Sequence, residues 1–354
     1  MPDLLARTAD LVAIPSVSHD EAALADHVID RLGGLGHLTV DRVGDNVVAR
    51  TQLGRALRLV VAGHLDTVPP DGNTVPKVDG DVLWGLGSAD MKGGLAVMLD
   101  LAEVVTDPAI DVTWVFYVAE EVAAAHNGLR YLFEQRPELV AGDVAVLGEP
   151  TGGTIEAGCQ GTMRVKVELA GARAHAARPW MGRNALHRAG RVLNALADYE
   201  PRRPLIDGCE YHEALQAVFA EGGVAGNVVP DRATVTINHR FAPDRTPEEA
   251  LAHVSSVLAP YIDDGDTIEL VDMAPAAAPG MTHPLLTALR ERNHLDVRAK
   301  LGWTDVSRFA AAGIPAVNFG PGDAIVAHTR DEHLDRASLE RVHAALHDLL
   351  TSGT

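Results

Sequence analysis

The chain is poor in aromatic residues and cysteine, and it has fewer basic than acidic residues. Aromatic residues make up only 4% of the 354 residues, so the core has to be built from aliphatic side chains. Two cysteines, Cys159 and Cys209, are too few for a disulfide framework and lack the spacing of metal ligands. Acidic residues outnumber basic ones by 49 to 30, and the net charge of −19 argues against partners such as nucleic acid or an anionic membrane.

Long hydrophobic runs are also missing. No apolar stretch approaches the roughly 18 residues that a membrane-spanning helix needs. The first residues lack a basic region followed by an apolar one, so we expect no signal peptide and a cytoplasmic location. With 47% hydrophobic and 22% charged residues, the composition is typical of a globular protein, and the length is sufficient for two domains.

The pattern of apolar residues predicts an α/β fold. Helical patterns alternate with near-continuous apolar strands, which are predicted at Leu57–Ala62, Val112–Val118, Val144–Leu147 and Ala316–Phe319. Such strands are typical of a mostly parallel sheet that helices cover on both faces. Near the N-terminus, Ser18 is a candidate N-cap for a helix that ends at Gly33.

A second kind of strand appears after Gly161. Strands with alternating apolar and polar residues are separated by two amphipathic helices, at Asn184–Leu196 and Pro247–Leu258. Alternation is typical of a sheet with one solvated face. We therefore predict a small α+β domain at residues 161–274, inserted into a catalytic domain formed by residues 1–160 and 275–354.

Ligand-type side chains follow the predicted strands and turns of the large domain. They are His64 with Asp66, Asp90, the pair Glu120 and Glu121, Glu149, and His328. Taken singly, each is explained as a helix cap, a solvated acid or a structural histidine. Together they meet at one sheet edge, where clustered carboxylates repel one another and are costly to desolvate without a cation. The combination therefore predicts a metal centre.

The donor set indicates which metal is bound and how many ions are held. Two histidines and several carboxylates without a thiolate suit Zn²⁺, with Co²⁺ or Mn²⁺ as alternatives. The ligands are sufficient for two ions, because a carboxylate can bridge a metal pair. In this assignment His64 and Glu149 bind one ion, Glu121 and His328 bind the other, and Asp90 binds both.

Two further acids have separate tasks in this prediction. Glu120 stays off the metals and serves as the general base that takes a proton from the reacting water. Asp66 orients the imidazole of His64 through its second ring nitrogen. A non-catalytic scaffold would lack a ligand or the base, and none is missing. A nucleotide-binding protein would need a glycine-rich loop that binds phosphate. The glycine-rich stretch of this chain, GLGSADMKGG, contains Asp90, whose charge would repel phosphate.

The motifs GHLDTVP, SADMKGG, YVAEEV, LGEP and AHTRDEH, in this order, resemble a known family. It is the family of dinuclear-zinc amidohydrolases that includes aminoacylases, acetylornithine deacetylases, carboxypeptidases and succinyl-diaminopimelate desuccinylases. The resemblance covers essentially the whole chain. It implies the ligand and base assignments given above, two zinc ions per subunit, and a homodimer formed through the inserted domain. It also implies a cis peptide bond at Asp90–Met91.

The resemblance assigns roles to the small domain as well. His175, in the sequence GARAHAARP, matches a histidine that reaches the partner subunit's active site and stabilises the tetrahedral oxyanion. Asn227 and Arg240 match positions that bind the carboxylate end of the substrate. Arg178 and Thr304 are further candidates for holding substrate carboxylates. Other histidines of this domain are interpreted as structural, namely His187 and His239.

Longer runs narrow the expected substrate. The runs CQGTMRV, GGVAGNVVPD and GWTDVSRFAAAGIPAVNFGPGD look most like the actinobacterial type of desuccinylase. That resemblance implies hydrolysis of N-succinyl-LL-2,6-diaminopimelate to succinate and LL-2,6-diaminopimelate. The alternatives are an acetylornithine deacetylase, another N-acyl-amino-acid deacylase or a dipeptidase of the same family, because these enzymes differ only in pocket shape.

Overall fold

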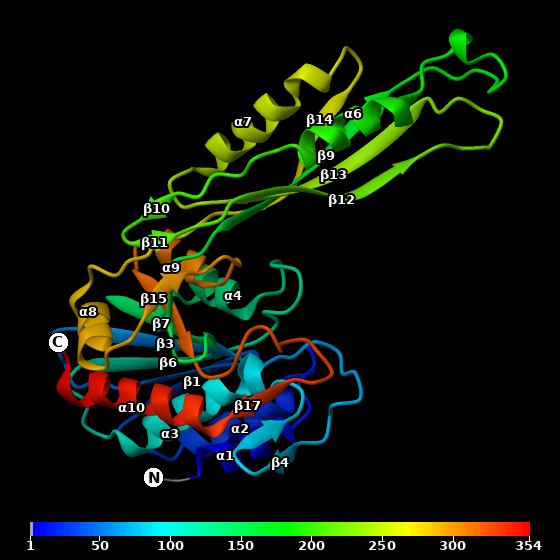
Figure 1. Ribbon diagram of the computed structural model, residues 1–354. Coiled ribbons are helices and arrows are strands. Elements are labelled where there is room, and N and C mark those ends of the chain that lie inside the picture. Colours follow the sequence, from blue (N-terminus) through cyan, green and yellow to red (C-terminus); the bar gives the residue numbers. More distant parts are fainter. Residues whose placement is uncertain (1–2) are drawn as a thin grey trace. The chain divides into compact units, whose positions relative to one another are not determined.

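The computed structural model describes residues 3–354 and divides the chain into two compact units. The large unit comprises the chain up to Ala157 together with Pro279–Arg298 and Arg308–Thr354 (Figure 1). The small unit comprises Gly158–Ala278 and Ala299–Ser307. Within residues 3–354, no helix is both long and apolar enough to cross a bilayer.

Residues 299–307 were predicted to belong to the catalytic domain, but they group with the small unit. Hydrogen bonds explain this grouping. The N–H of Gln160 donates to the carbonyl of Lys300 at 3.2 Å, and the hydroxyl of Ser307 donates to the carbonyl of Pro275 at 2.7 Å. The segment is thus tied to the strands on which the small unit begins and ends.

The large unit is built on an eight-stranded mixed sheet with the order β1-β2-β6-β3-β7-β16-β8-β15. Its centre is parallel, with β3 between β6 and β7, and with β16 beside β7. Strands β1, β2 and β8 are antiparallel to their neighbours. The predicted α/β fold with a mostly parallel central sheet is confirmed. The strands are β1 (Thr39–Val43), β2 (Asn46–Arg50), β3 (Arg58–His64), β6 (Asp111–Tyr117), β7 (Val144–Pro150), β8 (Ile155–Ala157), β15 (Val297–Ala299) and β16 (Ala316–Gly320).

Helices cover this sheet on both faces, since every residue of β6, β7 and β16 is buried. Helix α3 (Gly93–Val104) is buried around its whole circumference over its first ten residues, as expected for a helix in the middle of a core. It packs against α1, α2 and α10 (Figure 1). The helices of this unit are α1 (Leu4–Val12), α2 (Ala22–Leu32), α3, α4 (Gly128–Gln135), α5 (Pro137–Val140), α8 (Pro284–Arg292) and α10 (Arg336–Ser352), while α9 (Val306–Ala311) begins at the boundary.

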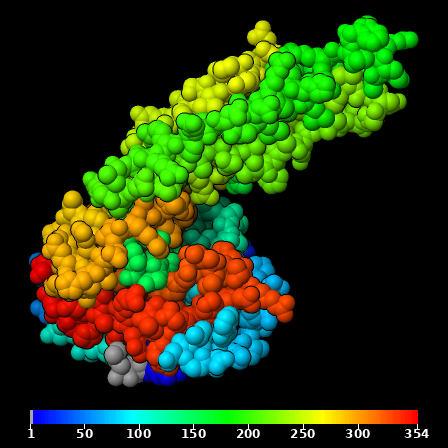
Figure 2. All heavy atoms as spheres, in the orientation of Figure 1, coloured from blue at the N-terminus to red at the C-terminus, as the bar shows by residue number. Residues whose placement is uncertain are grey.

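The small unit contains a four-stranded antiparallel sheet with the order β12-β13-β9-β14. Buried and half-exposed residues alternate along β9 and β13, which leaves one face for α6 and α7 to cover with an aliphatic core. In the space-filling view this unit forms an elongated block (Figure 2). Its main elements are β9 (Gly161–Ala170), β12 (Ala214–Gly222), β13 (Arg232–Phe241), β14 (Thr267–Ala274), α6 (Ala185–Ala197) and α7 (Pro247–Leu258).

Several short elements complete the two units. A three-stranded sheet in the large unit has the order β17-β5-β4, and two strands of the small unit form a hairpin. The short strands are β4 (Lys77–Asp79), β5 (Val82–Trp84), β10 (Leu205–Ile206), β11 (Cys209–Glu210) and β17 (His333–Asp335). The short helical segments are η1 (Ser88–Lys92), η2 (Pro179–Met181) and η3 (Ala259–Tyr261).

The start of α2 differs from the prediction. The helix begins at Ala22, and its first residues are preceded by Glu21 rather than by Ser18. Ser18 therefore lies too far from the first helical N–H groups to cap them. Its hydroxyl instead donates to the carboxylate of Asp66 at 2.7 Å. The predicted cap is wrong, and the residue belongs to the surroundings of the candidate site.

Candidate metal centre

Five segments of the large unit place ligand-type side chains at the carboxyl ends of the parallel strands, where open α/β sheets carry their chemistry. His64 is the last residue of β3, and Glu149 is the last but one of β7. Glu121 follows β6, and Asp90 lies in η1, which leads into α3. His328 lies in the loop between β16 and β17. The peptide bond Asp90–Met91 is cis, as predicted.

Three of these side chains, those of His64, Glu121 and His328, gather around the carboxylate of Asp90. Its Oδ1 lies 3.1 Å from Nε2 of His64, and its Oδ2 lies 3.3 Å from Nε2 of His328. The same nitrogen of His328 lies 2.7 Å from Oε1 of Glu121. One ligand atom each from His64, Asp90 and Glu121 lies within 4.8 Å of the others. Each oxygen of Asp90 thus faces a different histidine, which is the geometry that a bridging ligand needs.

Glu149 lies at the same sheet edge. Ala62 of β3 pairs with Leu147 of β7, and His64 and Glu149 each follow two residues later on these adjacent strands. The side chain is buried, with only 6% of the residue exposed. The register therefore places Glu149 beside His64, on the side that the predicted first ion requires.

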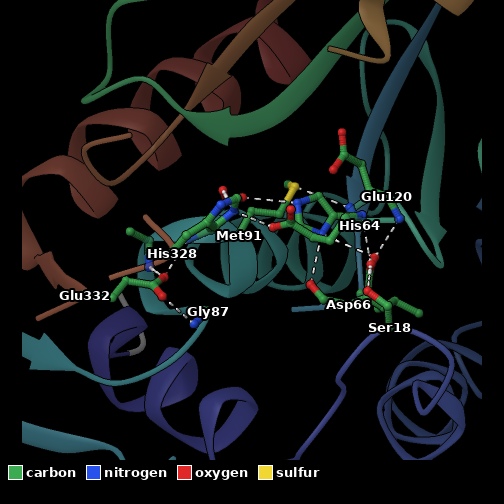
Figure 3. Close-up of polar contacts among 12 residues, drawn as sticks. Ser18, His64, Asp66, Gly87, Met91, Glu120, His328 and Glu332 are labelled. Carbon is green, nitrogen blue, oxygen red and sulfur yellow. Dashed lines mark hydrogen bonds and ion pairs between the residues drawn. The ribbon is translucent and has the colours of Figure 1, made fainter. Parts of the chain in front are cut away.

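Asp66 lies beside Nδ1 of His64 (Figure 3). Nδ1 of His64 lies 3.0 Å from the backbone carbonyl of Asp66 and 3.5 Å from its Oδ1. An Nδ1–H that donates to the carbonyl leaves Nε2 free to bind on the Asp90 side. The carboxylate of Asp66 mainly accepts other bonds, from the Ser18 hydroxyl and from the backbone N–H groups of Glu120 and Glu121. One acid thus orients the imidazole and fixes the turn after β6.

The electrostatics of the cluster favour bound cations. Burial lowers the pKa of His64, but its hydrogen bonds with Asp66 and Asp90 outweigh burial and raise that pKa overall. Hydrogen bonds with Asp90 and Glu121 raise the pKa of His328 to about 10. Burial raises the pKa of Asp66, but hydrogen bonding and the charge of His64 lower it to about 2. The negative charge around the two histidines thus favours their protonated forms, and divalent ions can replace those protons.

Glu120 lies at the edge of the cluster. Its backbone N–H donates to Asp66, while its side chain extends away from Asp66 (Figure 3). The preceding residue, Ala119, has φ +57°, a left-handed conformation that is uncommon outside glycine. His328 has φ +61°. Such conformations cost about 1–3 kcal/mol each and persist where the surroundings enforce them, often at functional sites.

One residue of the site was missed from the sequence. The motif AHTRDEH was interpreted only through His328, but Glu332 in the same motif is also buried against the Asp90 segment. Its carboxylate accepts backbone N–H groups from Gly87, Ala89 and Asp90, each at 3.0 Å. The sequence signal was an acid directly before the short strand β17, which could equally have been a solvated residue.

The predicted oxyanion donor and substrate-binding residues all lie in the small unit. His175, Arg178 and Asn227 are exposed. Their loops adjoin, since the N–H of Ala176 donates to the carbonyl of Asn227 at 2.8 Å. Nδ1 of His175 accepts the N–H of Ala177 at 3.0 Å, so a neutral imidazole carries its proton on Nε2. His175 is therefore prepared to donate a hydrogen bond outward.

Arg240 and Thr304 both lie near Cys159. The Arg240 guanidinium is half-buried, and burial lowers its pKa; within residues 3–354 it forms no ion pair with a carboxylate. The carbonyl of Thr304 accepts a weak bond from the thiol of Cys159 at 3.8 Å. The Thr304 hydroxyl is buried and has no hydrogen-bond partner among the described residues. A buried polar group in this state costs about 1–3 kcal/mol, which a bound ligand can recover.

Known proteins resemble this chain over nearly its whole length. The model of the family described as Peptidase family M20/M25/M40 matches residues 60–352. A putative succinyl-diaminopimelate desuccinylase DapE of Mycobacterium tuberculosis is 52% identical over 334 residues, which cover 94% of this chain and 93% of the relative. A succinyl-diaminopimelate desuccinylase of Corynebacterium glutamicum is 44% identical, covering 99% and 96%. The YXEP protein of Bacillus subtilis, described as a dinuclear metal binding peptidase from the M20 family, has a TM-score of 0.70 at 17% identity, covering 98% and 96%.

Proposed function

The chain belongs to peptidase family M20/M25/M40, and we propose that within this family of metal-dependent hydrolases it is a succinyl-diaminopimelate desuccinylase. It hydrolyses N-succinyl-LL-2,6-diaminopimelate to succinate and LL-2,6-diaminopimelate, a step of lysine and diaminopimelate biosynthesis. The observation that carries the hydrolytic chemistry is the Asp90 carboxylate held between His64 and His328. The choice of substrate is supported by two relatives with this name at 52% and 44% identity over nearly the whole chain.

The donor set fits two zinc ions, with Co²⁺ or Mn²⁺ able to substitute. His64 and Glu149 would hold one ion, Glu121 and His328 would hold the other, and Asp90 would contribute to both sites. The fit is supported by largely buried carboxylates whose charge needs compensation and by imidazole nitrogens directed at them. When bound, such a pair of ions lowers the pKa of water and polarises the amide carbonyl.

The protein's own groups carry the proton transfers. Glu120 takes a proton from the attacking water as the water oxygen bonds to the amide carbon. It returns that proton to the leaving nitrogen as the carbon–nitrogen bond breaks. Asp66 fixes Glu120 through its backbone N–H. Nε2–H of His175, supplied by the partner subunit, donates to the oxyanion that forms.

The substrate's charge explains the arginines of the small unit. Its carboxylates need cationic and hydrogen-bonding partners, which are scarce on a protein with a net charge of −19. Arg240, which has no carboxylate partner within residues 3–354, and the unbonded hydroxyl of Thr304 provide two such groups. Asn227 and Arg178 provide further donors from the exposed loops.

A homodimer formed through the small unit is part of the proposal. Strand β12 lies at the edge of its sheet, and almost all its residues are exposed. Phe219, on this strand, is 64% exposed. An unpaired apolar edge strand is a ready surface for pairing with another chain. The cytoplasmic location remains a prediction from the sequence.

A substrate panel tests the proposed function. Zinc-loaded protein is assayed on N-succinyl-LL-2,6-diaminopimelate, acetylornithine and a set of dipeptides, with an E120Q preparation as the control for contaminating hydrolases. We expect kcat/KM for the succinylated substrate to exceed the others by about 100-fold or more, as a site built for specific polar groups allows. Faster hydrolysis of acetylornithine or of a dipeptide would move the protein to another branch of the family.

A further inference from the structure

Glu332 binds the Asp90 segment entirely through backbone N–H groups. Oε1 accepts the N–H of Ala89 and of Asp90, and Oε2 accepts the N–H of Gly87, each at 3.0 Å (Figure 3). Only 1% of Glu332 is exposed, so these bonds form away from solvent. Hydrogen bonds to a charged group stabilise a structure more than those between neutral groups. Three such bonds therefore attach the Asp90 segment firmly to the carboxylate of Glu332.

The Asp90 segment cannot satisfy these N–H groups itself. Asp90 has φ −122° and ψ +95°, and Met91 has φ −132° and ψ +36°, so the chain is not helical there. Gly87 has φ +76°, and a Cβ at this position would lie 2.7 Å from Cγ2 of Thr67. A segment of this shape offers buried N–H groups without helical acceptors, and Glu332 supplies the acceptors.

The Asp90 segment also carries a buried cation, Lys92, whose charge attracts that of Glu332. The Nζ of Lys92 donates to the carbonyl of Ile14 at 2.7 Å. The Asp90 segment is thus held by Glu332 on one side and by the loop that follows α1 on the other.

We propose that Glu332 is a positioning residue that sets the Asp90 carboxylate between His64 and His328. Glu332 and His328 belong to one loop. This loop supplies a proposed metal ligand and also accepts a hydrogen bond from the backbone of the proposed bridging ligand, Asp90. Without these hydrogen bonds, Asp90 could move relative to His328 and would no longer be held where two ions could share its carboxylate. This inference rests on the proposed metal centre.

The test replaces one oxygen of the carboxylate. In Glu332→Gln the remaining oxygen can still accept two backbone N–H groups. The new NH₂ group then faces a third backbone N–H, so two hydrogen-bond donors oppose each other. Asp111→Asn is the matched control. Asp111 is buried at the start of β6, away from the strand end that carries the site, and its carboxylate accepts the N–H of Leu53 and Arg55, each at 2.9 Å.

Zinc affinity is the deciding measurement, made on the apo-protein by competition with a chromophoric chelator. We expect E332Q to bind zinc about 10- to 100-fold more weakly than the unaltered protein, and excess zinc to restore much of its kcat. D111N should lose thermal stability to a similar extent and keep its zinc affinity. Unchanged zinc affinity in E332Q, with a loss of Tm like that of D111N, would reduce Glu332 to a structural role.

A conservative variant covers the case in which E332Q does not fold. Glu332→Asp keeps both oxygens but shortens the side chain by one methylene, so it cannot reach all three N–H groups at once. Weaker zinc binding by E332D supports the proposal, and affinity equal to the unaltered protein overturns it. If the unaltered protein binds no zinc, the metal centre itself is refuted, whereas equal binding by protein and variant refutes only the role of Glu332.

Discussion

Oδ1 of Asp66 accepts the backbone N–H of Glu120 at 2.9 Å, and Oδ2 accepts that of Glu121 at 3.0 Å. Asp66, which also contacts His64, thereby sets the position of the proposed base and of a proposed metal ligand. Asp66→Asn replaces one accepting oxygen by a donor, which opposes one of these N–H groups. We expect kcat and zinc affinity to fall together, each by about 10- to 100-fold, measured by steady-state kinetics and zinc titration.

The control for this variant is Ser18→Ala, which removes the hydroxyl that donates to the same carboxylate. The loss of one hydrogen bond of about 1 kcal/mol should change zinc affinity by only a few-fold. Equal effects of the two substitutions would show that the backbone contacts to Glu120 and Glu121 are unimportant.

Glu120→Gln tests the general base. The amide cannot take up a proton, so kcat should fall by about 10²- to 10⁴-fold. Because Glu120 is not assigned to a metal, the zinc content measured by mass spectrometry should stay near that of the unaltered protein. Substantial turnover by the variant, or loss of zinc, would assign Glu120 a different role.

His175→Ala tests the oxyanion donor. We expect kcat to fall by about 10²- to 10³-fold with zinc content unchanged, as for loss of an oxyanion-hole donor. His187→Ala, on the exposed surface of α6, is the control and should leave kcat unchanged. If His175 acts across a dimer, mixed dimers of E120Q and H175A contain one intact site and regain activity. Inactive mixed dimers would place His175 outside the partner's site.

Two glycines give opposite predictions for stability. A Cβ on Gly94, in the first turn of α3, would lie 2.4 Å from the carbonyl oxygen of Gly148, just before Glu149. Gly94→Ala should therefore lower the free energy of unfolding by about 1–3 kcal/mol. Gly190 lies inside α6 with nothing within 4 Å of its Cβ position, so Gly190→Ala should raise that free energy by about 0.5–1 kcal/mol. Urea denaturation of both variants measures the two signs.

The small unit should be less stable in acid because of two neighbouring histidines, of which His239 is buried and His253 is partly buried. Burial lowers the pKa of His239 and of His253, whose rings lie 5.6 Å apart, and the charge of Arg245 lowers both further. Around them, Arg202 also lowers both pKa values, while Glu213 raises them. Unfolded histidine has a pKa of about 6.5, so below that pH the unfolded chain binds more protons than the folded one. Stability is therefore retained above about pH 6.5 and is lost as the pH falls through this value.

His239→Asn isolates this effect. The amide can still donate to the carbonyl of Ala214, which Nδ1 of His239 contacts at 2.9 Å, but it does not titrate. We expect the Tm of the metal-free variant to depend less on pH between about 5 and 7 than that of the unaltered protein. His187→Asn, at an exposed position of the same unit, should keep the full dependence. The same slope in all three proteins would contradict the prediction.

The central architecture could be predicted because its strands are unambiguous. Residues of β6, β7 and β16 are buried on both faces, so each strand appears in the sequence as a continuous apolar run. Side chains at the ends of such runs, such as His64 and Glu149, then share one sheet edge without any further information. Strand β12 was missed for the opposite reason. Nearly every residue of it is exposed, so neither a run nor an alternation marks it.

The hydrogen bonds that hold the site in place could not be predicted from the sequence. Nothing in a side-chain pattern indicates that Ser18 donates to Asp66 rather than to a helix, or that Glu332 accepts three amides from a distant segment. Such bonds depend on the local conformation of η1 and of the turn after β6. The sequence therefore indicated the proposed ligands and the orienting role of Asp66, and missed the contacts made by Ser18 and Glu332.

The order of the ligands along the chain has a consequence for how the protein is made. His64, Asp90, Glu121 and Glu149 all precede the first residue of the small unit, whereas strand β16 and His328 follow its main segment. On a ribosome that adds about 5–20 residues per second, the last ligand emerges on the order of 10 to 40 s after Glu149. Until then the nascent chain carries an incomplete, acid-rich pocket beside a sheet that lacks one of its central strands. We therefore expect the complete metal centre to form only at the final stage of synthesis or in the released chain.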